Sequence, residues 1–155
     1  MTRTIHLVIS SNGRKPAHFA IFVPIKDQGL TGKLIHVTGN PATGFFLEFQ
    51  RNHDIKAIHE DAQEPYQVLP VAQIGGRYII DTPYEGTTVV RDTTARDRLE
   101  SAALSIPPPG RSPNPFDPSA PNCQNWARDY INGLVQAGFI ASSAIAVIES
   151  APKVI

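Results

Sequence analysis

The chain separates strand-like sequence from helix-like sequence, and this separation limits what it can fold into. Short β-branched and aromatic runs, bounded by turn residues, fill the first half and are typical of strands. From Asp92 onward, apolar residues recur at helical spacing. Strands followed by helices predict an α+β domain, with an antiparallel sheet and helices on one side of it. At 155 residues the chain can bury a core, and we expect a single domain over residues 1–155.

The expected strands follow from composition and from their flanking turns. They cover residues 4–10, 18–23, 33–37, 45–50, 66–74 and 77–80, of which 66–74 is weakened by Pro70. We expect the second and third of these to form a hairpin. The polar residues 52–64 are expected to be irregular.

A proline-rich segment divides the helical part. A helix with Leu99 and Ala103 on its apolar face should end at Pro107. Residues 107–121 hold seven of the fourteen prolines, which predicts an extended, stiff loop. The next helix begins at Cys123 and runs to Gly138, and Ser142 is the expected N-cap of a last short helix.

Charge and cysteine content exclude several classes of partner. Lys plus Arg and Asp plus Glu both number 14, so the net charge is zero and no basic face for nucleic acid is expected. One cysteine cannot form an internal disulfide, and no stretch has the length or apolarity of a signal peptide or a membrane span. We expect a soluble protein of the cytoplasm without a cofactor.

Cys123 is the first candidate for chemistry. Asn122 is a good N-cap, so Cys123 falls in the first turn of its helix. The unpaired N–H groups and the helix dipole at that position favour a thiolate over a thiol. Most lone cysteines are small buried hydrophobes, but polar Asn122, Gln124 and Asn125 surround this one.

Two histidines on the expected hairpin are candidates for its base. His18 heads an apolar strand and His36 lies near the end of the next, so pairing of the strands would bring the two rings close together. His18 would then take the thiol proton, and His36 would orient the imidazole. Taken alone, His18 would be interpreted as a solvent-facing histidine at a strand end.

The remaining polar residues have weaker claims. His6, His53 and His59 are expected to be solvated, and Glu48 and Asp54 form no evident carboxylate pair. Cys123, His18 and His36 are zinc-ligand types but lack any closely spaced pair, so a zinc site ranks low and no metal is expected. No glycine-rich phosphate loop is present.

Three short motifs in this order resemble the circularly permuted papain-like enzymes. They are His18-Phe19-Ala20-Ile21-Phe22-Val23, then Leu34-Ile35-His36, then Asn122-Cys123-Gln124-Asn125-Trp126. The family patterns are His-Trp-Ala-Ile-Tyr-Val, a second histidine ending the next strand, and Asn-Cys-Glu-His-Phe opening a late helix. The family includes the lecithin:retinol acyltransferase-like proteins and the permuted NlpC-type peptidases. Residues 51–121 match nothing in it.

The resemblance implies a permuted papain-like (NlpC-like) architecture and a role for each motif. Cys123 would be the nucleophile, His18 the general base and His36 the orienting residue, with Asn122 and Gln124 beside the oxyanion. The activity implied is hydrolysis or acyl transfer on a small-molecule, peptide or acyl substrate through a thioester. A biosynthetic amide- or ester-forming enzyme, and a catalytically inactive binding domain on the same fold, remain alternatives.

Overall fold

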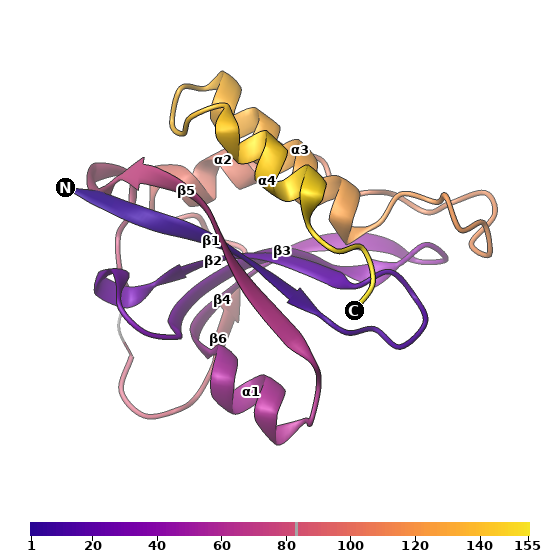
Figure 1. Ribbon diagram of the computed structural model, residues 1–155, viewed down its shortest axis with the longest axis horizontal. Coiled ribbons are helices and arrows are strands. Elements are labelled where there is room, and N and C mark those ends of the chain that lie inside the picture. Colours follow the sequence, from indigo (N-terminus) through magenta and orange to yellow (C-terminus); the bar gives the residue numbers. More distant parts are fainter. Residues whose placement is uncertain (83) are drawn as a thin grey trace.

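One antiparallel sheet organises the chain (Figure 1). The computed structural model describes residues 1–82 and 84–155. Its strands are β1 (Thr2–Ser10), β2 (His18–Pro24), β3 (Thr31–Asn40), β4 (Gly44–Asp54), β5 (Tyr66–Gly75) and β6 (Val90–Asp92). They form a six-stranded sheet in the order β5-β1-β2-β3-β4-β6, and each neighbouring pair is antiparallel. The predicted α+β class, with an antiparallel sheet, is confirmed.

Three of the four helices cover one face of this sheet. The helices are α1 (Ile55–Asp61), α2 (Arg98–Leu104), α3 (Cys123–Gln136) and α4 (Ser143–Ser150), with 3-10 turns η1 (Ile25–Asp27) and η2 (Gly76–Tyr78). Figure 1 shows α2, α3 and α4 together above the sheet and α1 on the other side. Ile55 of α1 packs with Val8 and Phe22 in a small second cluster on that other side. The expectation of helices on one side therefore holds for three helices and is wrong for α1.

Two expectations about single segments are wrong. Residues 52–64 are not irregular: β4 continues through Asp54, whose side chain accepts a hydrogen bond from the Ala57 N–H (3.0 Å) and starts α1. Residues 77–80 form no strand, because the chain turns at Gly76, whose N–H donates to the Met1 carbonyl (2.9 Å). The short strand β6 was not predicted.

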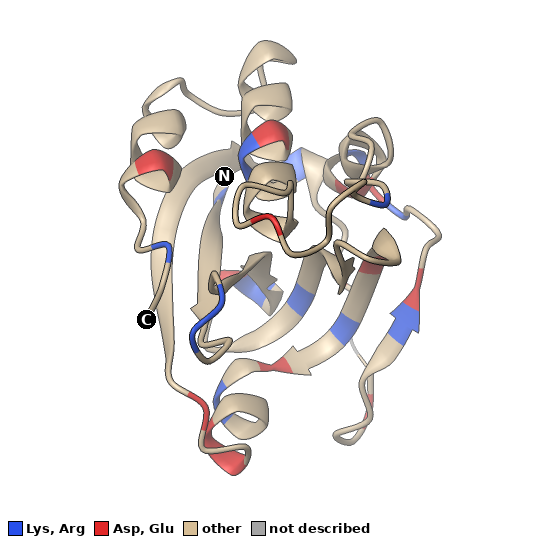
Figure 2. Cartoon of the chain, turned by 90° about the vertical axis from the view of Figure 1, so that its right-hand side faces the viewer, with Lys and Arg blue, Asp and Glu red and all other residues tan. Residues whose placement is uncertain are grey.

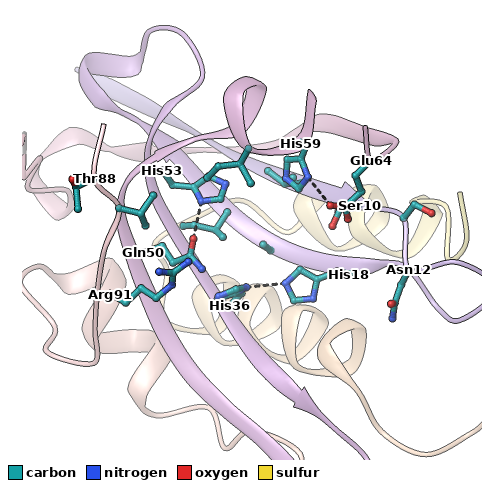
Figure 3. Close-up of a pocket in the computed structure, with 16 residues that line it drawn as sticks. Ser10, Asn12, His18, His36, Gln50, His53, His59, Glu64, Thr88 and Arg91 are labelled. Carbon is teal, nitrogen blue, oxygen red and sulfur yellow. Dashed lines mark hydrogen bonds and ion pairs between the residues drawn. The ribbon is translucent and has the colours of Figure 1, made fainter. Parts of the chain in front are cut away.

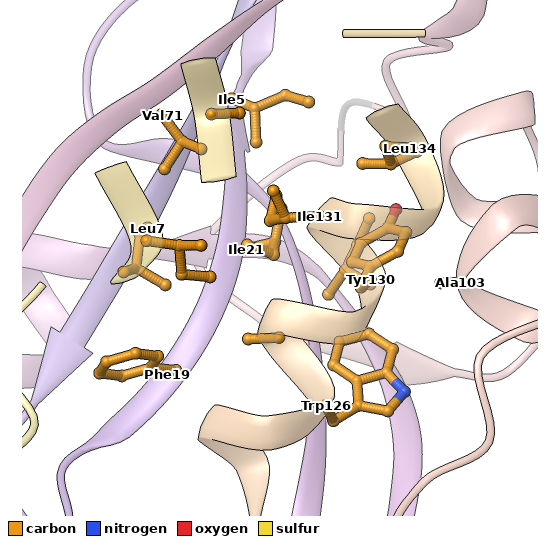
Figure 4. Packing of buried hydrophobic residues seen from close by; sticks show 14 of the residues in the cluster. Ile5, Leu7, Phe19, Ile21, Val71, Ala103, Trp126, Tyr130, Ile131 and Leu134 are labelled. Carbon is orange, nitrogen blue, oxygen red and sulfur yellow. The ribbon is translucent and has the colours of Figure 1, made fainter. Parts of the chain in front are cut away.

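The alternation of side chains along β2 separates two environments. Phe19, Ile21 and Val23 point toward the helices and are buried in the main core, whereas Ala20 and Phe22 belong to the second cluster. Figure 4 shows the apolar side chains of the sheet meeting those of α3. The apolar stripe predicted for α3 is the face that closes this core.

Hydrogen bonds fix α3 at its start and along its length. Asn122 is the N-cap, as predicted, and forms a capping box with Asn125. Further along, the Trp126 indole donates to the Ile106 carbonyl (2.9 Å) and the Tyr130 hydroxyl to the Leu99 carbonyl (2.6 Å). These bonds attach α3 to α2, so the position of the Cys123 end is determined by packing along the whole helix.

A buried ion cluster joins α2 to the sheet. Arg51 of β4 and Glu100 of α2 are both fully buried, and Arg51 Nη2 lies 2.6 Å from Glu100 Oε1. Lys33 of β3 lies 2.5 Å from Glu100 Oε2 and 2.5 Å from Asp97 Oδ2. Each charge therefore has an opposite partner in the interior, which is the condition under which buried charges are tolerated.

Charged residues of both signs are distributed over the side of the molecule that Figure 2 shows, where basic and acidic residues both occur on strands and helices. Within residues 1–82 and 84–155, none of the helices combines the length and apolarity that crossing a bilayer requires.

The ion cluster yields a stability prediction. Substituting Arg51→Met leaves Glu100 with one fewer cation in a buried site, and we expect a loss of about 3–5 kcal/mol in the free energy of unfolding. Urea denaturation of the purified variant measures this loss. Arg91→Met, at a side chain that is 60% exposed, is the matched control and should change stability little. Equal stability of the two variants would contradict a structural role for the cluster.

Candidate functional site

Strands β2 and β3 bring two of the predicted site residues together. His18 and His36 lie on the sheet face opposite α3, because each alternates with residues of the main core. The backbone ladder between the strands ends at Ile21↔Ile35, so it does not reach the histidines. In its place, His18 Nε2 and His36 Nδ1 lie 2.8 Å apart and form a hydrogen bond across the gap.

Glu48 of β4, which the sequence did not single out, fixes which nitrogens carry protons. It lies directly opposite His36 in the β3–β4 ladder, and its Oε1 is 2.9 Å from His36 Nε2. A carboxylate accepts hydrogen bonds and does not donate them, so His36 Nε2–H is the donor. With both rings neutral, His36 Nδ1 then accepts from His18 Nε2–H. The remaining nitrogen, His18 Nδ1, is left as an unprotonated base.

The hydrogen-bonded residues His18, His36 and Glu48 form a relay, in which the pKa values of His18 and Glu48 keep the first ring neutral and the carboxylate charged. Burial, followed by the neighbouring His36, lowers the pKa of His18 to about 3. The hydrogen bond from His36 lowers the pKa of Glu48 to about 2. At neutral pH the relay therefore begins at an uncharged base, His18, and ends at an anion, Glu48.

Glu48 also orders a second branch of polar side chains. Gln50 Nε2 donates to Glu48 Oε1 (2.7 Å), and Gln50 Oε1 lies 2.7 Å from His53 Nδ1. His53 and His59 are 4% and 8% exposed, so the expectation that both are solvated is wrong. Residues 52–64 are polar, which suggested exposure to solvent, but α1 lies within this segment and packs against the sheet. His59 stacks on Tyr66, with ring centroids 5.1 Å apart.

Both branches line one cavity of about 650 Å³ on the α1 side of the sheet, here called the histidine cavity (Figure 3). It is lined by Val8, Ser10, Ser11, Asn12, His18, Ala20, Leu34, His36, Gln50, His53, Ile58, His59, Glu64, Thr88, Val89 and Arg91. This volume falls in the range of small-molecule sites.

Cys123 lies on the helix side of the sheet, beside the beginning of β2. It is 7% exposed, and its Sγ is 3.9 Å from the Ala17 carbonyl oxygen. The Phe19 N–H also interacts with the sulfur. The thiol thus contacts the backbone on both sides of His18, while the His18 ring is turned toward His36. Within the described chain, no hydrogen bond joins Cys123 to either imidazole.

The resting thiol is not the thiolate that the sequence predicted. Burial raises the pKa of Cys123 and outweighs the N–H groups of Phe19, Cys123 and Gln124, which act in the opposite direction. The helix start is present as expected, but the hydrocarbon around the sulfur has the larger effect.

A second cavity, of about 730 Å³, reaches Cys123 and is here called the thiol cavity. It is bounded by the proline-rich loop, the β3–β4 turn and the chain before β2. Its lining is Asn12, Lys15, Pro16, Gly39, Asn40, Pro41, Ala42, Phe45, Pro115, Phe116, Asp117, Pro118, Ala120, Asn122 and Cys123. Asn12, in the connection between β1 and β2, lines both cavities.

Asn122 and Gln124 have different roles. Asn122 Oδ1 accepts from the Gln124 N–H (2.9 Å), and its Nδ2 donates to no residue of the described ranges. The Gln124 side chain is occupied, because its Nε2 donates to the carbonyls of Ala17 (2.9 Å) and Lys153 (2.8 Å). Gln124 therefore anchors α3 to the chain before β2 and to the C-terminal segment, and its amide is not free to act as an oxyanion donor.

The metal alternative finds no support in the geometry. Over residues 1–82 and 84–155, His, Cys, Asp and Glu side chains form no group of three that is arranged to hold a metal ion. Cys123 and the histidine pair lie on opposite faces of the sheet, so these three residue types do not converge.

Comparison with known proteins gives one match. The model of a family of unknown function, DUF6540, matches residues 5–141, which is most of the chain. No curated protein and no solved structure matches.

The buried imidazoles predict a loss of stability in acid. Burial lowers the pKa of His53 to about 4, in addition to that of His18. An imidazole with a lower pKa in the folded chain stabilises it fully above the unfolded value of about 6.5, and this stability is lost as the pH falls toward the folded value. Each of the two should contribute up to about 1.4 kcal/mol per pH unit.

Urea denaturation between about pH 5.5 and 7 measures this dependence. We expect His53→Gln to show a shallower decline than the unsubstituted chain, because one titrating group is gone. Identical slopes for both proteins would show that His53 is not buried in its neutral form.

Proposed function

The chain belongs to the DUF6540 family, and we propose that it is a cysteine-dependent hydrolase or acyltransferase with a permuted papain-like fold. It acts on an amide, peptide or ester bond through a thioester on Cys123. The observation that carries this proposal is the His18–His36–Glu48 relay, which leaves His18 Nδ1 unprotonated next to the strand start that Cys123 contacts.

The gap between β2 and β3 supports a direct contact between base and nucleophile. The strands are not paired beyond Ile21↔Ile35, and the sulfur lies against the backbone of Ala17 and Phe19. Because the His18 ring and Cys123 lie on opposite faces of the sheet in the resting structure, catalysis requires a local rearrangement at the start of β2 that brings His18 Nδ1 to Cys123 Sγ. Catalytic hydrogen bonds are often long in a substrate-free enzyme and shorten when substrate binds.

Formation of the thioester follows from the protonation states. Since both thiol and imidazole are neutral, His18 Nδ1 takes the thiol proton as the sulfur forms its bond to the carbonyl carbon. The tetrahedral intermediate then collapses: the bond to the leaving nitrogen or oxygen breaks, and that atom takes the proton from His18. Glu48 stabilises the transient imidazolium through His36.

Resolution of the thioester uses the same base. Water, an alcohol or an amine gives a proton to His18 and attacks the thioester carbonyl. The carbon–sulfur bond then breaks, and the sulfur recovers the proton from His18. The acceptor that occupies this position decides between hydrolase and transferase, including the amide- or ester-forming case.

The oxyanion would be held at the start of α3. The Cys123 N–H is in the first turn and has no intrahelical acceptor. The Asn122 side chain supplies a second donor, Nδ2, because the N-cap bond uses its oxygen. Donors placed in this way stabilise the developing negative charge.

The thiol cavity is the proposed substrate site, with the proline-rich loop as its outer wall. Phe45 and the 93%-exposed Phe116 offer apolar contact to an acyl or peptide group there. A catalytic thiol must stay reduced, so we propose that the enzyme works in the cytoplasm.

A second candidate is a catalytically inactive binding domain on the same fold. The buried sulfur, the raised pKa of the Cys123 thiol and the missing contact to an imidazole favour it. In that case the cavities bind a ligand and no thioester forms.

Alkylation of Cys123 by iodoacetamide separates the two candidates. With base assistance from neutral His18, we expect the rate constant to change little between about pH 5.5 and 7.5. In His18→Gln the thiolate alone reacts, so the rate should rise about tenfold per pH unit and fall well below that of the unsubstituted chain at the acid end. Mass spectrometry of the modified protein gives the rates.

His6→Gln, at a histidine that lines neither cavity, is the control and should behave as the unsubstituted chain. If the unsubstituted chain and His18→Gln show the same tenfold rise, His18 does not act on the thiol and the binding domain is favoured.

A matched pair at Asn122 tests the oxyanion donor. Asn122→Asp keeps an N-cap acceptor but has no Nδ2, so we expect normal stability and a rate of Cys123 acylation by p-nitrophenyl acetate about a hundredfold lower. Asn122→Ala should lose about 1 kcal/mol of stability as well. Unchanged acylation in Asn122→Asp would remove Asn122 from the site.

A further inference from the structure

The histidine cavity contains a buried acceptor that no part of the described chain satisfies. His53 Nε2 is fully shielded and meets no donor in residues 1–82 and 84–155. The residue is 4% exposed and lines the cavity. Figure 3 shows its ring at the wall between Gln50 and His59. A buried polar atom without a partner costs stability and points to a bound group.

The proton on His53 is assigned by the same carboxylate that orders the relay. Glu48 accepts from Gln50 Nε2, so the Gln50 oxygen faces His53 Nδ1 and that nitrogen must donate. In the neutral ring, Nε2 then carries no proton, and its lone pair can accept a hydrogen bond. A complementary ligand must present a hydrogen-bond donor.

The charges around His53 disfavour an ion of either sign. The pKa of His53 is lowered first by burial and then by His59 and His36, with Arg91 adding to the effect, so the site resists a further positive charge. An anion would face the lone pair of Nε2. Arg91 itself lies at the rim, with 60% of its side chain exposed.

The rest of the cavity wall suits an uncharged, partly apolar molecule. Val8, Ala20, Leu34, Ile58 and Val89 form apolar surface around the histidines. An alcohol satisfies all of these conditions, because its hydroxyl donates a hydrogen bond without bringing a charge into the cavity.

We infer that the histidine cavity is a binding site for a neutral alcohol. A turn of the His53 ring, whose Nε2 has no accessible surface in the unliganded chain, brings this nitrogen to the ligand hydroxyl, and the apolar body packs against Val8, Leu34 and Ile58. The two other buried atoms without a partner in the described chain, Arg3 Nε and His6 Nδ1, line neither cavity and carry no such inference. His18 and His36 of the relay also line this cavity, but the binding measurement itself needs no reaction at Cys123.

Binding of three matched probes tests this site in the unmodified chain. Benzyl alcohol has the donor and an apolar body, benzyl methyl ether lacks the donor, and benzylamine is charged at neutral pH. We expect benzyl alcohol to bind about tenfold more tightly than either, the ratio expected for one hydrogen bond. Titrations followed by the nitrogen-15 resonances of the histidine rings give each Kd and should shift His53 Nε2.

Substitutions then assign the contact. His53→Phe should weaken benzyl alcohol about tenfold and leave the ether unchanged, whereas His53→Gln, which keeps an acceptor, should restore most of the affinity. His6→Phe is the control for loss of a buried imidazole elsewhere and should bind as the unsubstituted chain does.

Three results would overturn the inference. The first is equal affinity for alcohol and ether, the second is tightest binding of benzylamine, and the third is no saturable binding of benzyl alcohol. The comparison of probes needs no variant, so it decides the matter even if His53→Phe does not fold.

Discussion

Neighbouring side chains on a β-strand point to opposite faces of the sheet, and this constraint at β2 and β3 governs both core and site. Phe19 and Ile21 must face α3 to close the main core, so His18 is turned to the other face. The thiol at the start of α3 and the imidazole at the start of β2 consequently approach the same strand end from opposite sides. The backbone ladder between β2 and β3 ends at Ile21↔Ile35, so the two strands are not paired next to these groups.

Glu48 determines which nitrogens of this arrangement carry protons. One carboxylate oxygen accepts from both His36 and Gln50, and the proton positions along two chains of side chains follow from that fact. One chain ends at His18 Nδ1, the proposed base, and the other at His53 Nε2, the proposed ligand contact. Because the pKa of Glu48 is lowered to about 2, its carboxylate stays charged across the physiological pH range. The direction of the hydrogen bonds in both series of side chains therefore stays the same. A single half-buried anion thus sets the proton positions at both the proposed base, His18 Nδ1, and the proposed ligand contact, His53 Nε2.

Much of the fold could be predicted because its signals are local. The strands, the N-cap at Asn122 and the apolar stripe of α3 follow from composition, capping and periodicity over a few residues. Glu48 was also within reach, since the turn pairs Asn40 with Gly44 and counting back along both strands places His36 opposite Glu48. Helix α1 has a local N-cap at Asp54 that the prediction overlooked. Strand β6 and the buried Arg51–Glu100 pair were not predictable in this way. Their stability comes from contacts between residues distant in sequence.

The sequence by itself determined which residue types are available to the site and in which elements they lie: a cysteine at a helix start and two histidines on paired strands. Tertiary structure alone decided their electrostatic state. Packing buried the sulfur, so that desolvation outweighs the helix start and the pKa of the thiol rises. It also buried His18 and His53 as neutral rings. The physical reason is that desolvation depends on everything packed around a group, whereas capping and strand alternation depend on a few neighbours along the chain.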